Sequence, residues 1–382
     1  MNIGVNVRTL IENSMTGVGW FIFETMKRLV AKHPEHTFYY FFDRPYSQKF
    51  ITSSNIIPIV VPPKCRYHQL FYKFWYDFQI PKALRKHKID LFISGDTVNT
   101  TKSKVPSILV IHDLAFEHYP NFAPANITRH FKKHVPLGAK KSSQIVTVSE
   151  YSKNDIATKY KIDLDKISIV YNGINNHFEP LDSDLKSKVK AQYSDNCDYF
   201  LFVGTIHPRK NLKNQLLAFD MFRKRINNST HKFLIAGTAW IWNKELDDAY
   251  SNMEFKNDVV FIGHLPSGEL SRVTASATAL MYVSIFEGFG IPIIEAFESK
   301  TPVITSNTSS MPEVAGNGAL IVDPFKPEDI FEAMNIIYSD PETVNQLIEN
   351  GLKRKELFSW DLTAEKFDKA FVKTVKAIGN LT

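Results

Sequence analysis

Short apolar runs alternate with amphipathic helical patterns along the whole chain. A continuously apolar strand is one buried on both faces, and strands separated by helices form parallel sheets with helices on both sides. The expected strands lie at residues 3–7, 37–42, 56–61, 89–94, 108–112, 145–149 and 167–170, and then at 199–203, 233–236, 259–262, 279–284, 303–305 and 319–322. The pattern therefore predicts an α/β fold with two doubly wound, Rossmann-like domains.

A polar, strand-poor stretch between Gly173 and Asp198 separates the two series of strands. The last segment repeats apolar side chains at helical spacing and predicts a final amphipathic helix. The expected division is an N-terminal domain over 1–175, a linker over 176–198, a C-terminal domain over 199–360 and a final helix over 361–382. Ligands of doubly wound folds collect beyond the carboxyl ends of the strands. The crevice between the two domains is therefore the expected site.

The composition is that of an ordinary globular protein, with 44% hydrophobic residues and a net charge of +6. Cys65 and Cys197 have no partner spacing, so we expect neither a disulfide framework nor a zinc site, and a reducing compartment. The N-terminus lacks the pattern of a signal peptide. The longest uncharged stretch, residues 273–286, is too short to cross a bilayer. We expect a cytoplasmic protein that contacts a membrane only peripherally.

The run from Ser284 to Glu295 contains two glutamates eight residues apart, Glu287 and Glu295. Glu287 ends an apolar strand and is followed by glycines, and Pro292 pre-sets the first turn of a helix. Two acids, flexible amides and a positive helix end suit a ligand that carries hydroxyls and phosphate. The alternative is two solvated glutamates around an ordinary turn.

A second cluster follows the first strand of the C-terminal domain, from Gly204 to Asn211. Arg209 and Lys210 lie there together where a helix begins. A bidentate arginine, a lysine and helix-end amides form a clamp for a diphosphate. A solvated basic turn is the alternative.

His112 and Asp113 end a strand of the N-terminal domain, where they could form hydrogen bonds at the crevice; a buried, satisfied histidine is the alternative. Gly17 and Gly19 lie where a helix opens, and we expect a flexible loop whose amides face the crevice. A nicotinamide fingerprint is disfavoured because Ile22 takes the third glycine position and because Gly17 is ten residues beyond the strand.

Two Asp-x-Asp triplets, at 163–165 and 182–184, lie in turns away from the expected strand ends, so we predict solvated turns and no metal. Residues 65–88 interleave aromatic and basic side chains. Phe71, Phe74 and Phe78 fall with Trp75 on one helical face, which predicts packing on the first sheet. A membrane-facing or lipid-acceptor surface is the alternative. No module for nucleic acid accompanies it.

Several short motifs occur in one order along the chain: Thr16-Gly-Val-Gly19, Val110-Ile-His-Asp113, Val148-Ser-Glu-Tyr-Ser152, Val170-Tyr-Asn-Gly173, Val203-Gly-Thr-Ile-His-Pro-Arg-Lys-Asn211, Glu287-Gly-Phe-Gly290 with Glu295, and Ser306-Asn-Thr-Ser-Ser-Met-Pro-Glu313. In these motifs the chain resembles the family 4 glycosyltransferases of the GT-B fold, and the resemblance extends from end to end. It is similar to their polysaccharide branch, which includes many mannosyltransferases.

The resemblance implies a retaining, metal-independent transfer of a sugar from a nucleotide diphosphate to a hydroxyl of a glycan or lipid-linked saccharide. Arg209 and Lys210 would neutralise the diphosphate and Glu295 would hold the ribose. Glu287 would position the sugar with Gly288, Phe289 and Gly290, and Gly204 would lie on the donor side. Gly17 and Gly19 would help to enclose the phosphates, and His112 would contact the sugar. Asp113 would lie toward the acceptor, which the N-terminal domain holds, and the final helix would cross back onto that domain.

The expected donor is GDP-mannose, followed by a UDP-sugar, in the synthesis of a polysaccharide such as lipopolysaccharide or of a glycolipid. No other cofactor is expected. Two rivals remain open: an epimerase or hydrolase of nucleotide sugars on the same scaffold, and a sugar-nucleotide-binding partner subunit without turnover.

Overall fold

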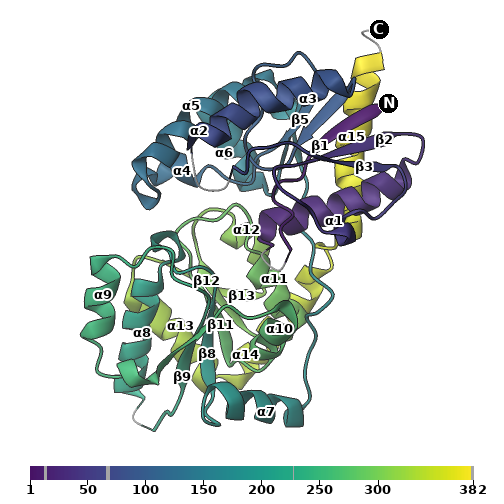
Figure 1. Cartoon of the computed structure of the whole chain (residues 1–382). Coiled ribbons are helices and arrows are strands. Elements are labelled where there is room, and N and C mark those ends of the chain that lie inside the picture. The colour runs from purple at the N-terminus through teal and green to yellow at the C-terminus, as the bar shows by residue number, and fades with distance from the viewer. Residues whose placement is uncertain (13–14, 66–68, 227, 380–382) are drawn as a thin grey trace. The chain divides into compact units, whose positions relative to one another are not determined.

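The computed structural model describes residues 1–12, 15–65, 69–226 and 228–379 (Figure 1). The chain forms two compact units. The first unit comprises Met1–Gly173 together with Trp360–Thr382, and the second unit comprises Ile174–Ser359.

The first unit is built on a seven-stranded parallel sheet of order β3-β2-β1-β4-β5-β6-β7. Its strands are β1 (Asn2–Asn6), β2 (Thr37–Phe42), β3 (Ile56–Val60), β4 (Leu91–Ser94), β5 (Ser107–Val110), β6 (Gln144–Thr147) and β7 (Ile167–Ile169). Its α-helices are α1 (Gly17–Lys32), α2 (Gln69–Phe74), α3 (Ile80–Lys86), α4 (Ala115–His118), α5 (Ala125–Lys141), α6 (Glu150–Tyr160) and α15 (Trp360–Gly379). Short turns are η1 (Gln48–Phe50), η2 (Trp75–Gln79), η3 (Pro120–Phe122) and η4 (Leu164–Lys166).

The second unit is built on a six-stranded parallel sheet of order β10-β9-β8-β11-β12-β13. Its strands are β8 (Tyr199–Val203), β9 (Lys232–Ala236), β10 (Val259–Gly263), β11 (Ala279–Tyr282), β12 (Val303–Ser306) and β13 (Ala319–Val322). Its helices are α7 (Ser183–Tyr193), α8 (Leu212–Arg225), α9 (Lys244–Ser251), α10 (Ser267–Ala275), α11 (Ile291–Glu298), α12 (Met311–Ala315), α13 (Pro327–Ser339) and α14 (Pro341–Lys355), with the turns η5 (Pro208–Lys210) and η6 (Lys256–Asp258).

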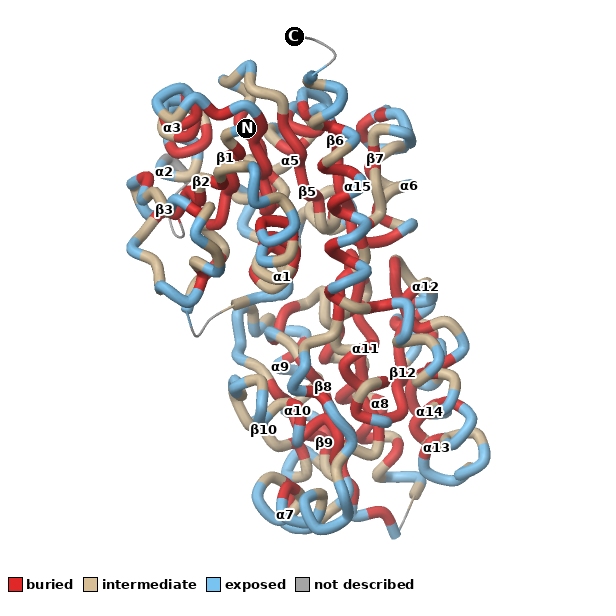
Figure 2. The backbone as a smooth tube through the Cα atoms, turned by 90° about the vertical axis from the view of Figure 1, so that its right-hand side faces the viewer, coloured by how far each residue is buried: buried red, intermediate tan, exposed pale blue. Residues whose placement is uncertain are grey.

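Each unit has a core in which the central strands are buried on both faces. All residues of β4, β5, β6, β8, β11 and β12 are buried, and the strands form the buried centre of each unit in Figure 2. Phe200, Phe219 and Phe233 pack in the second core, and Phe92, Leu109 and Ile145 pack in the first. The two predicted doubly wound domains are therefore confirmed.

The predicted strands all exist, but several of them end one or two residues earlier than expected, and two of these early ends bear on the site. β5 ends at Val110, so His112 lies beyond it. β11 ends at Tyr282, because the backbone then leaves the sheet and the N–H of Ile285 donates to the carbonyl of Arg209 at 2.8 Å. These departures place His112 and Glu287 in the loops that follow the strands.

The segment expected as a linker differs from that expectation. It contains α7, which contacts α10, and Tyr193 donates a hydrogen bond to Glu269 at 3.2 Å, so these residues belong to the second unit. The final helix α15 contacts α1, β6 and β7 of the first unit, and Figure 1 shows it alongside α1. The hydroxyl of Thr363 donates to the carbonyl of Tyr171 at 2.7 Å.

The expectation that the aromatic face of residues 65–88 packs on the first sheet is wrong for three of its four residues. Trp75 is fully buried and donates its indole N–H to the carbonyl of Val61 at 2.7 Å. Phe71, Phe74 and Phe78 are exposed. The reason is η2, a π-helical turn that changes the helical register and turns Trp75 and Tyr76 inward.

Among the residues that the structure describes, no helix combines the length and apolar character that a membrane span requires.

Candidate active site

The loop between β8 and α8 is held close to the β9 loop by glycines. Gly204 has φ of +138° and Gly237 has φ of +156°. A Cβ on Gly237 would lie 1.9 Å from the carbonyl oxygen of Gly204, so only glycine fits there. A Cβ on Gly204 would lie 3.3 Å from the Cε atom of Lys210. The predicted donor-side residue Gly204 therefore lies directly against the lysine of the predicted clamp.

The loop between β11 and α11 is fixed by serines and a glycine. The N–H of Glu287 donates to the hydroxyl of Ser309 at 3.0 Å. The hydroxyl of Ser310 donates to the carbonyls of Glu287 at 2.9 Å and Phe289 at 3.0 Å. Gly290 has φ of +114° at the start of α11. The backbone from Glu287 to Gly290 is thus held in place before any ligand binds.

The two loops meet in an ionic cluster formed by Arg209, Lys210 and Glu287. The Nη1 atom of Arg209 lies 2.5 Å from Oε2 of Glu287, and the Nζ atom of Lys210 lies 2.6 Å from Oε1. Lys210 also donates to the hydroxyl of Tyr282 at 2.7 Å, and Arg209 donates to the carbonyl of Phe286 at 2.9 Å. The sequence analysis singled out Glu287 separately from Arg209 and Lys210. The structure brings the three side chains together, although Arg209 and Glu287 are 78 positions apart in the chain.

The cluster keeps Glu287 ionised. Its side chain is buried, which by itself would raise the pKa, but the charges of Arg209 and Lys210 outweigh burial and lower the pKa to about 2. Two cations face one carboxylate, so the cluster carries an excess of one positive charge. An anionic group is the ligand that this excess favours.

Glu295 has the opposite environment. It lies on α11 and is 8% exposed. Burial raises its pKa to about 7. Asn175 donates a hydrogen bond at 3.2 Å to the carboxylate, which lowers the pKa but does not outweigh burial. Burial is the main cause that raises the pKa of Tyr282, and the negative charges of Glu287 and Glu295 raise it further. The hydroxyl of Tyr282 therefore interacts electrostatically with both glutamates.

The first unit places His112 at the carboxyl end of its sheet. Its Nε2 atom lies 3.2 Å from the carbonyl oxygen of Gly95, and its ring packs edge-on against Phe21 with centroids 5.3 Å apart. Burial lowers its pKa, so the imidazole is neutral at pH 7. Asp113 accepts a hydrogen bond at 2.9 Å from the N–H of Ala115, the first residue of α4.

Four residues near His112 were missed by the sequence analysis. Asp96 pairs with Arg8 and accepts from Tyr76, and Asn6 donates to Tyr76 at 2.8 Å and to Asp96 at 2.9 Å. Arg8 lies two residues after β1 and Asp96 two residues after β4. Polar side chains directly after buried strands were the signal that could have identified them.

Gly17 and Gly19 lie in the first turn of α1, so the expected loop at these two residues is a helix start. A Cβ on Gly19 would lie 2.9 Å from the carbonyl oxygen of Thr9, which explains the glycine by close packing. The Asp-x-Asp triplets are capping motifs: Asp163 accepts from the N–H of Asp165, and Asp182 accepts from the N–H of Leu185.

Within the described parts of the chain, residue types that bind metals gather at His33, Glu35 and His36, whose ligand atoms lie within 4.8 Å of one another. This group precedes β2, at the amino end of the first sheet. It is therefore separate from the strand ends that carry His112.

The two doubly wound units have the GT-B architecture that solved glycosyltransferases share. WaaG, a glycosyltransferase involved in lipopolysaccharide biosynthesis, has a TM-score of 0.76 at 13% identity, covering 97% of this chain and 99% of that one. Anabaena Alr3699/HepE, solved in complex with UDP and glucose, has a TM-score of 0.74 at 15% identity, with the same coverage. At these identities the likeness concerns the fold.

Two family models divide the chain between them. Residues 15–178 match Glycosyltransferase Family 4, and residues 185–354 match Glycosyl transferases group 1. The chain therefore belongs to the family 4 glycosyltransferases, as its motifs predicted. The O-antigen chain mannosyltransferase RfbU of Salmonella typhimurium is 28% identical over 305 residues, or 79% of this chain and 81% of RfbU. The O-antigen chain mannosyltransferase B of Escherichia coli is 25% identical over 280 residues, or 73% of each chain.

Proposed function

We propose that this glycosyltransferase moves mannose from GDP-mannose to a hydroxyl of a growing cell-surface polysaccharide or lipid-linked saccharide, with retention at the anomeric carbon. The observation that carries the proposal is the cluster of Arg209, Lys210 and Glu287 at the strand ends of the second unit. The choice of mannose is supported by the two O-antigen relatives, both of which are mannosyltransferases by name.

The donor is proposed to bind the second unit with its diphosphate on Arg209 and Lys210. The excess positive charge of their cluster complements a diphosphate without a metal ion. Gly204 and the backbone from Gly288 to Gly290 line the same loops and would allow close approach of the phosphates and the sugar. Glu295 is proposed to accept hydrogen bonds from the ribose hydroxyls.

The chemical step breaks the bond between the anomeric carbon and a phosphate oxygen and forms a bond from that carbon to the acceptor oxygen. The acceptor proton passes to the departing phosphate oxygen on the same face, which leaves the configuration retained. Negative charge grows on the diphosphate as it leaves, so fixed cations stabilise the transition state more than the ground state.

Glu287 is proposed to position the sugar and to hold the two cations, and not to act as base or nucleophile. A carboxylate whose pKa is about 2 is a weak proton acceptor at neutral pH. Its two oxygens are moreover engaged by Arg209 and Lys210. His112, which is neutral, is proposed to contact the sugar by a hydrogen bond, and Asp113 to lie toward the acceptor.

The test is a donor panel with release of nucleotide as the readout. GDP-mannose, UDP-glucose, UDP-galactose and UDP-N-acetylglucosamine are compared, each with and without saccharide acceptors. The proposal expects release with GDP-mannose that requires an acceptor. Release without an acceptor would favour a hydrolase, interconversion of the sugar would favour an epimerase, and binding of GDP without turnover would favour a partner subunit.

Two finer parts of the proposal have their own measurements. The anomeric configuration of the product, read by NMR, should equal that of the donor; an inverted linkage would overturn retention. Turnover should be unchanged by a chelator of divalent cations, and a loss that added magnesium or manganese restores would overturn the metal-independent clamp.

A further inference from the structure

The helical run formed by α2, η2 and α3 exposes three phenylalanines of the first unit. Phe71, Phe74 and Phe78 are 48%, 43% and 61% exposed, and the rings of Phe74 and Phe78 lie with centroids 5.6 Å apart. Single exposed apolar residues are ordinary, but a contiguous apolar patch on a globular protein marks an interaction surface. The sequence had left a membrane or lipid surface open as the alternative for this segment.

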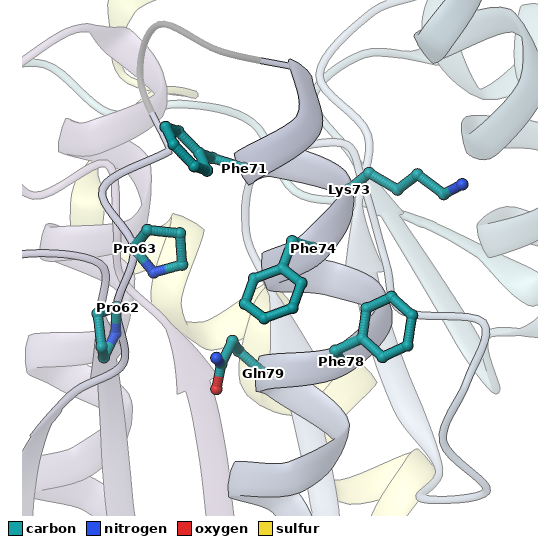
Figure 3. A pocket seen from close by; sticks show the side chains of 7 residues that line it. All are labelled: Pro62, Pro63, Phe71, Lys73, Phe74, Phe78 and Gln79. Carbon is teal, nitrogen blue, oxygen red and sulfur yellow. The ribbon is translucent and has the colours of Figure 1, made fainter.

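These phenylalanines border an apolar groove of 660 Å³. Figure 3 shows Pro62 and Pro63 on one side of the groove and the helix that carries Phe71 and Phe74 on the other. The ammonium group of Lys73 points away from the hollow in the same view. The groove thus offers apolar walls with a cation beside them, which is the pattern of a lipid chain and its headgroup.

The charge around the groove is strongly positive. Residues 62–88 hold seven lysines and arginines and one acid, Asp77. Helix α5, which contacts α2, holds five lysines and arginines and no acid. The net charge of these two segments is therefore +6 and +5, whereas the whole chain carries +6. The rest of the protein therefore carries a net charge of −5, so the positive charge is concentrated in these two segments.

The one acid of the run lowers this charge by one and lies near helix α5. Asp77 is half-buried and acts on His134 of α5, whose pKa is lowered mainly by burial. Burial, followed by the charges of His134 and Lys73, lowers the pKa of His130 on the same helix to about 4. Both histidines are therefore neutral at pH 7, and the fixed charges of the face are its lysines and arginines.

We propose that the aromatic-basic face, defined by Phe71, Phe74, Phe78 and the lysines and arginines that the structure describes within residues 62–88 and α5, docks on a bilayer that contains anionic phospholipids. The phenylalanines enter the acyl boundary and the lysines and arginines contact the headgroups. A nucleic acid is not favoured, because no recognised nucleic-acid-binding module accompanies this segment in the sequence. The inference goes beyond the proposed transfer reaction and does not depend on the identity of the donor.

The first experiment is flotation of the full-length protein with vesicles. Vesicles of phosphatidylcholine alone are compared with vesicles of phosphatidylcholine and phosphatidylglycerol. We expect binding to the mixed vesicles, and a loss of at least about tenfold when salt is raised from about 0.1 M to about 1 M. Equal binding to both vesicle types, or binding to neither, would overturn the proposal.

The second experiment removes the apolar part of the face. Phe74→Ser with Phe78→Ser should lower partitioning to the mixed vesicles by about tenfold or more, because each phenylalanine loses its burial in the acyl boundary. The matched control is Phe325→Ser with Leu357→Ser in the second unit, where these side chains are 57% and 49% exposed. The control pair should bind vesicles as the wild type does.

The third experiment removes charge at constant shape. Lys73→Gln with Lys82→Gln should lower partitioning by roughly 25-fold, since each lysine near an anionic surface contributes about fivefold. Lys256→Gln with Lys353→Gln makes the same change of net charge at exposed positions of the second unit and should have little effect. An equal loss of vesicle binding in both pairs would show that binding depends on the net charge of the protein and not on this face, and would overturn the proposal.

A last arm separates the bilayer from a lipid-linked acceptor. The circular dichroism spectrum and the midpoint of thermal unfolding should be the same for all variants, which shows that they are folded. If the phenylalanine pair keeps its vesicle binding but loses activity toward a lipid-linked acceptor in detergent, then the groove holds the chain of the substrate and the docking proposal is wrong.

Discussion

The carboxyl ends of the strands carry charged side chains in both units, but the balance of charge differs. In the second unit two cations, Arg209 and Lys210, share one carboxylate, that of Glu287. In the first unit Arg8 is matched by Asp96, and the groups around them, Tyr76 and Asn6, are neutral. One site therefore has an excess of positive charge, and the other is balanced and rich in hydrogen-bonding groups.

This difference corresponds to two kinds of ligand. An unbalanced positive cluster favours a diphosphate, particularly when charge grows on it during reaction. A balanced network that exposes no net charge suits the hydroxyls of a saccharide, which need donors and acceptors and no counter-ion. We therefore propose that the same doubly wound scaffold provides a donor site in one unit and an acceptor site in the other, through the side chains that follow its strands.

The largest expected effect tests the positive cluster. Lys210→Ala should lower turnover by about 10²–10³-fold, the usual consequence of removing one well-placed electrostatic donor. The control is Lys213→Ala on α8, where the lysine pairs with the exposed Glu245 at 3.0 Å. Steady-state rates near those of the wild type for Lys210→Ala would remove the clamp from the mechanism.

The second effect tests the balanced network of the first unit. Asp96→Ala leaves Arg8 without its carboxylate in a buried setting and should lower the free energy of unfolding by about 3 kcal/mol. The affinity for GDP should stay the same, because the side chains predicted to bind the nucleotide, those of Arg209, Lys210 and Glu295, lie in the second unit. Chemical denaturation and calorimetry measure the two quantities. A weaker affinity for GDP at unchanged stability would break the division of roles between the units.

The third effect distinguishes the two glutamates of the second unit. Glu295, with a pKa near 7, should accept hydrogen bonds from ribose only when ionised, so GDP affinity should rise about tenfold from pH 6 to pH 8 through this group. Glu295→Gln should abolish that part of the pH dependence and leave the part that belongs to the phosphates. If calorimetry gives parallel profiles for the two proteins, Glu295 has no role at the ribose.

The same pKa values predict opposite effects on folding. Glu295 holds its proton in the folded chain up to about pH 7 and loses it near pH 4.5 when unfolded, so its contribution to stability falls as pH rises through that window. Glu287 is ionised down to about pH 2 when folded, so its contribution is present at neutral pH and is lost as pH falls from 4.5 toward 2.

Much of the fold could be predicted from the sequence, because each buried parallel strand is visible in the sequence as a continuous apolar run. The ends of the strands could not, because they depend on contacts from other segments. Ile285 leaves the sheet for the carbonyl of Arg209, which is 76 positions earlier in the chain. The exposed face of α2 and η2 was missed for a related reason: a π-helical turn changes which side chains point inward, and helical periodicity does not reveal it.

The site shows the same limit. Arg209, Lys210, Glu287 and Glu295 were found because charged residues beside glycines follow apolar strands. The environments of these side chains could not be predicted. The pKa of Glu295, for example, is about 7 because the side chain is buried on α11. Arg8 and Asp96 are 88 positions apart, so neither indicates the other in the sequence. Asn175 was assigned to the end of the N-terminal domain, although it belongs to the second unit and contacts the carboxylate that we propose to hold the ribose.

The smallest expected effect concerns this asparagine. Its amide donates to Glu295 and lowers the pKa of that carboxyl group against the effect of burial. Asn175→Ala should therefore shift the midpoint of pH-dependent GDP binding upward by roughly half to one pH unit, the equivalent of one hydrogen bond of about 1 kcal/mol. Asn176→Ala, at the exposed neighbouring position, is the matched control and should leave the midpoint unchanged. A shift downward, or none, would mean that burial alone sets the ionisation of Glu295, and that the two glutamates differ only because one of them lies beside cations.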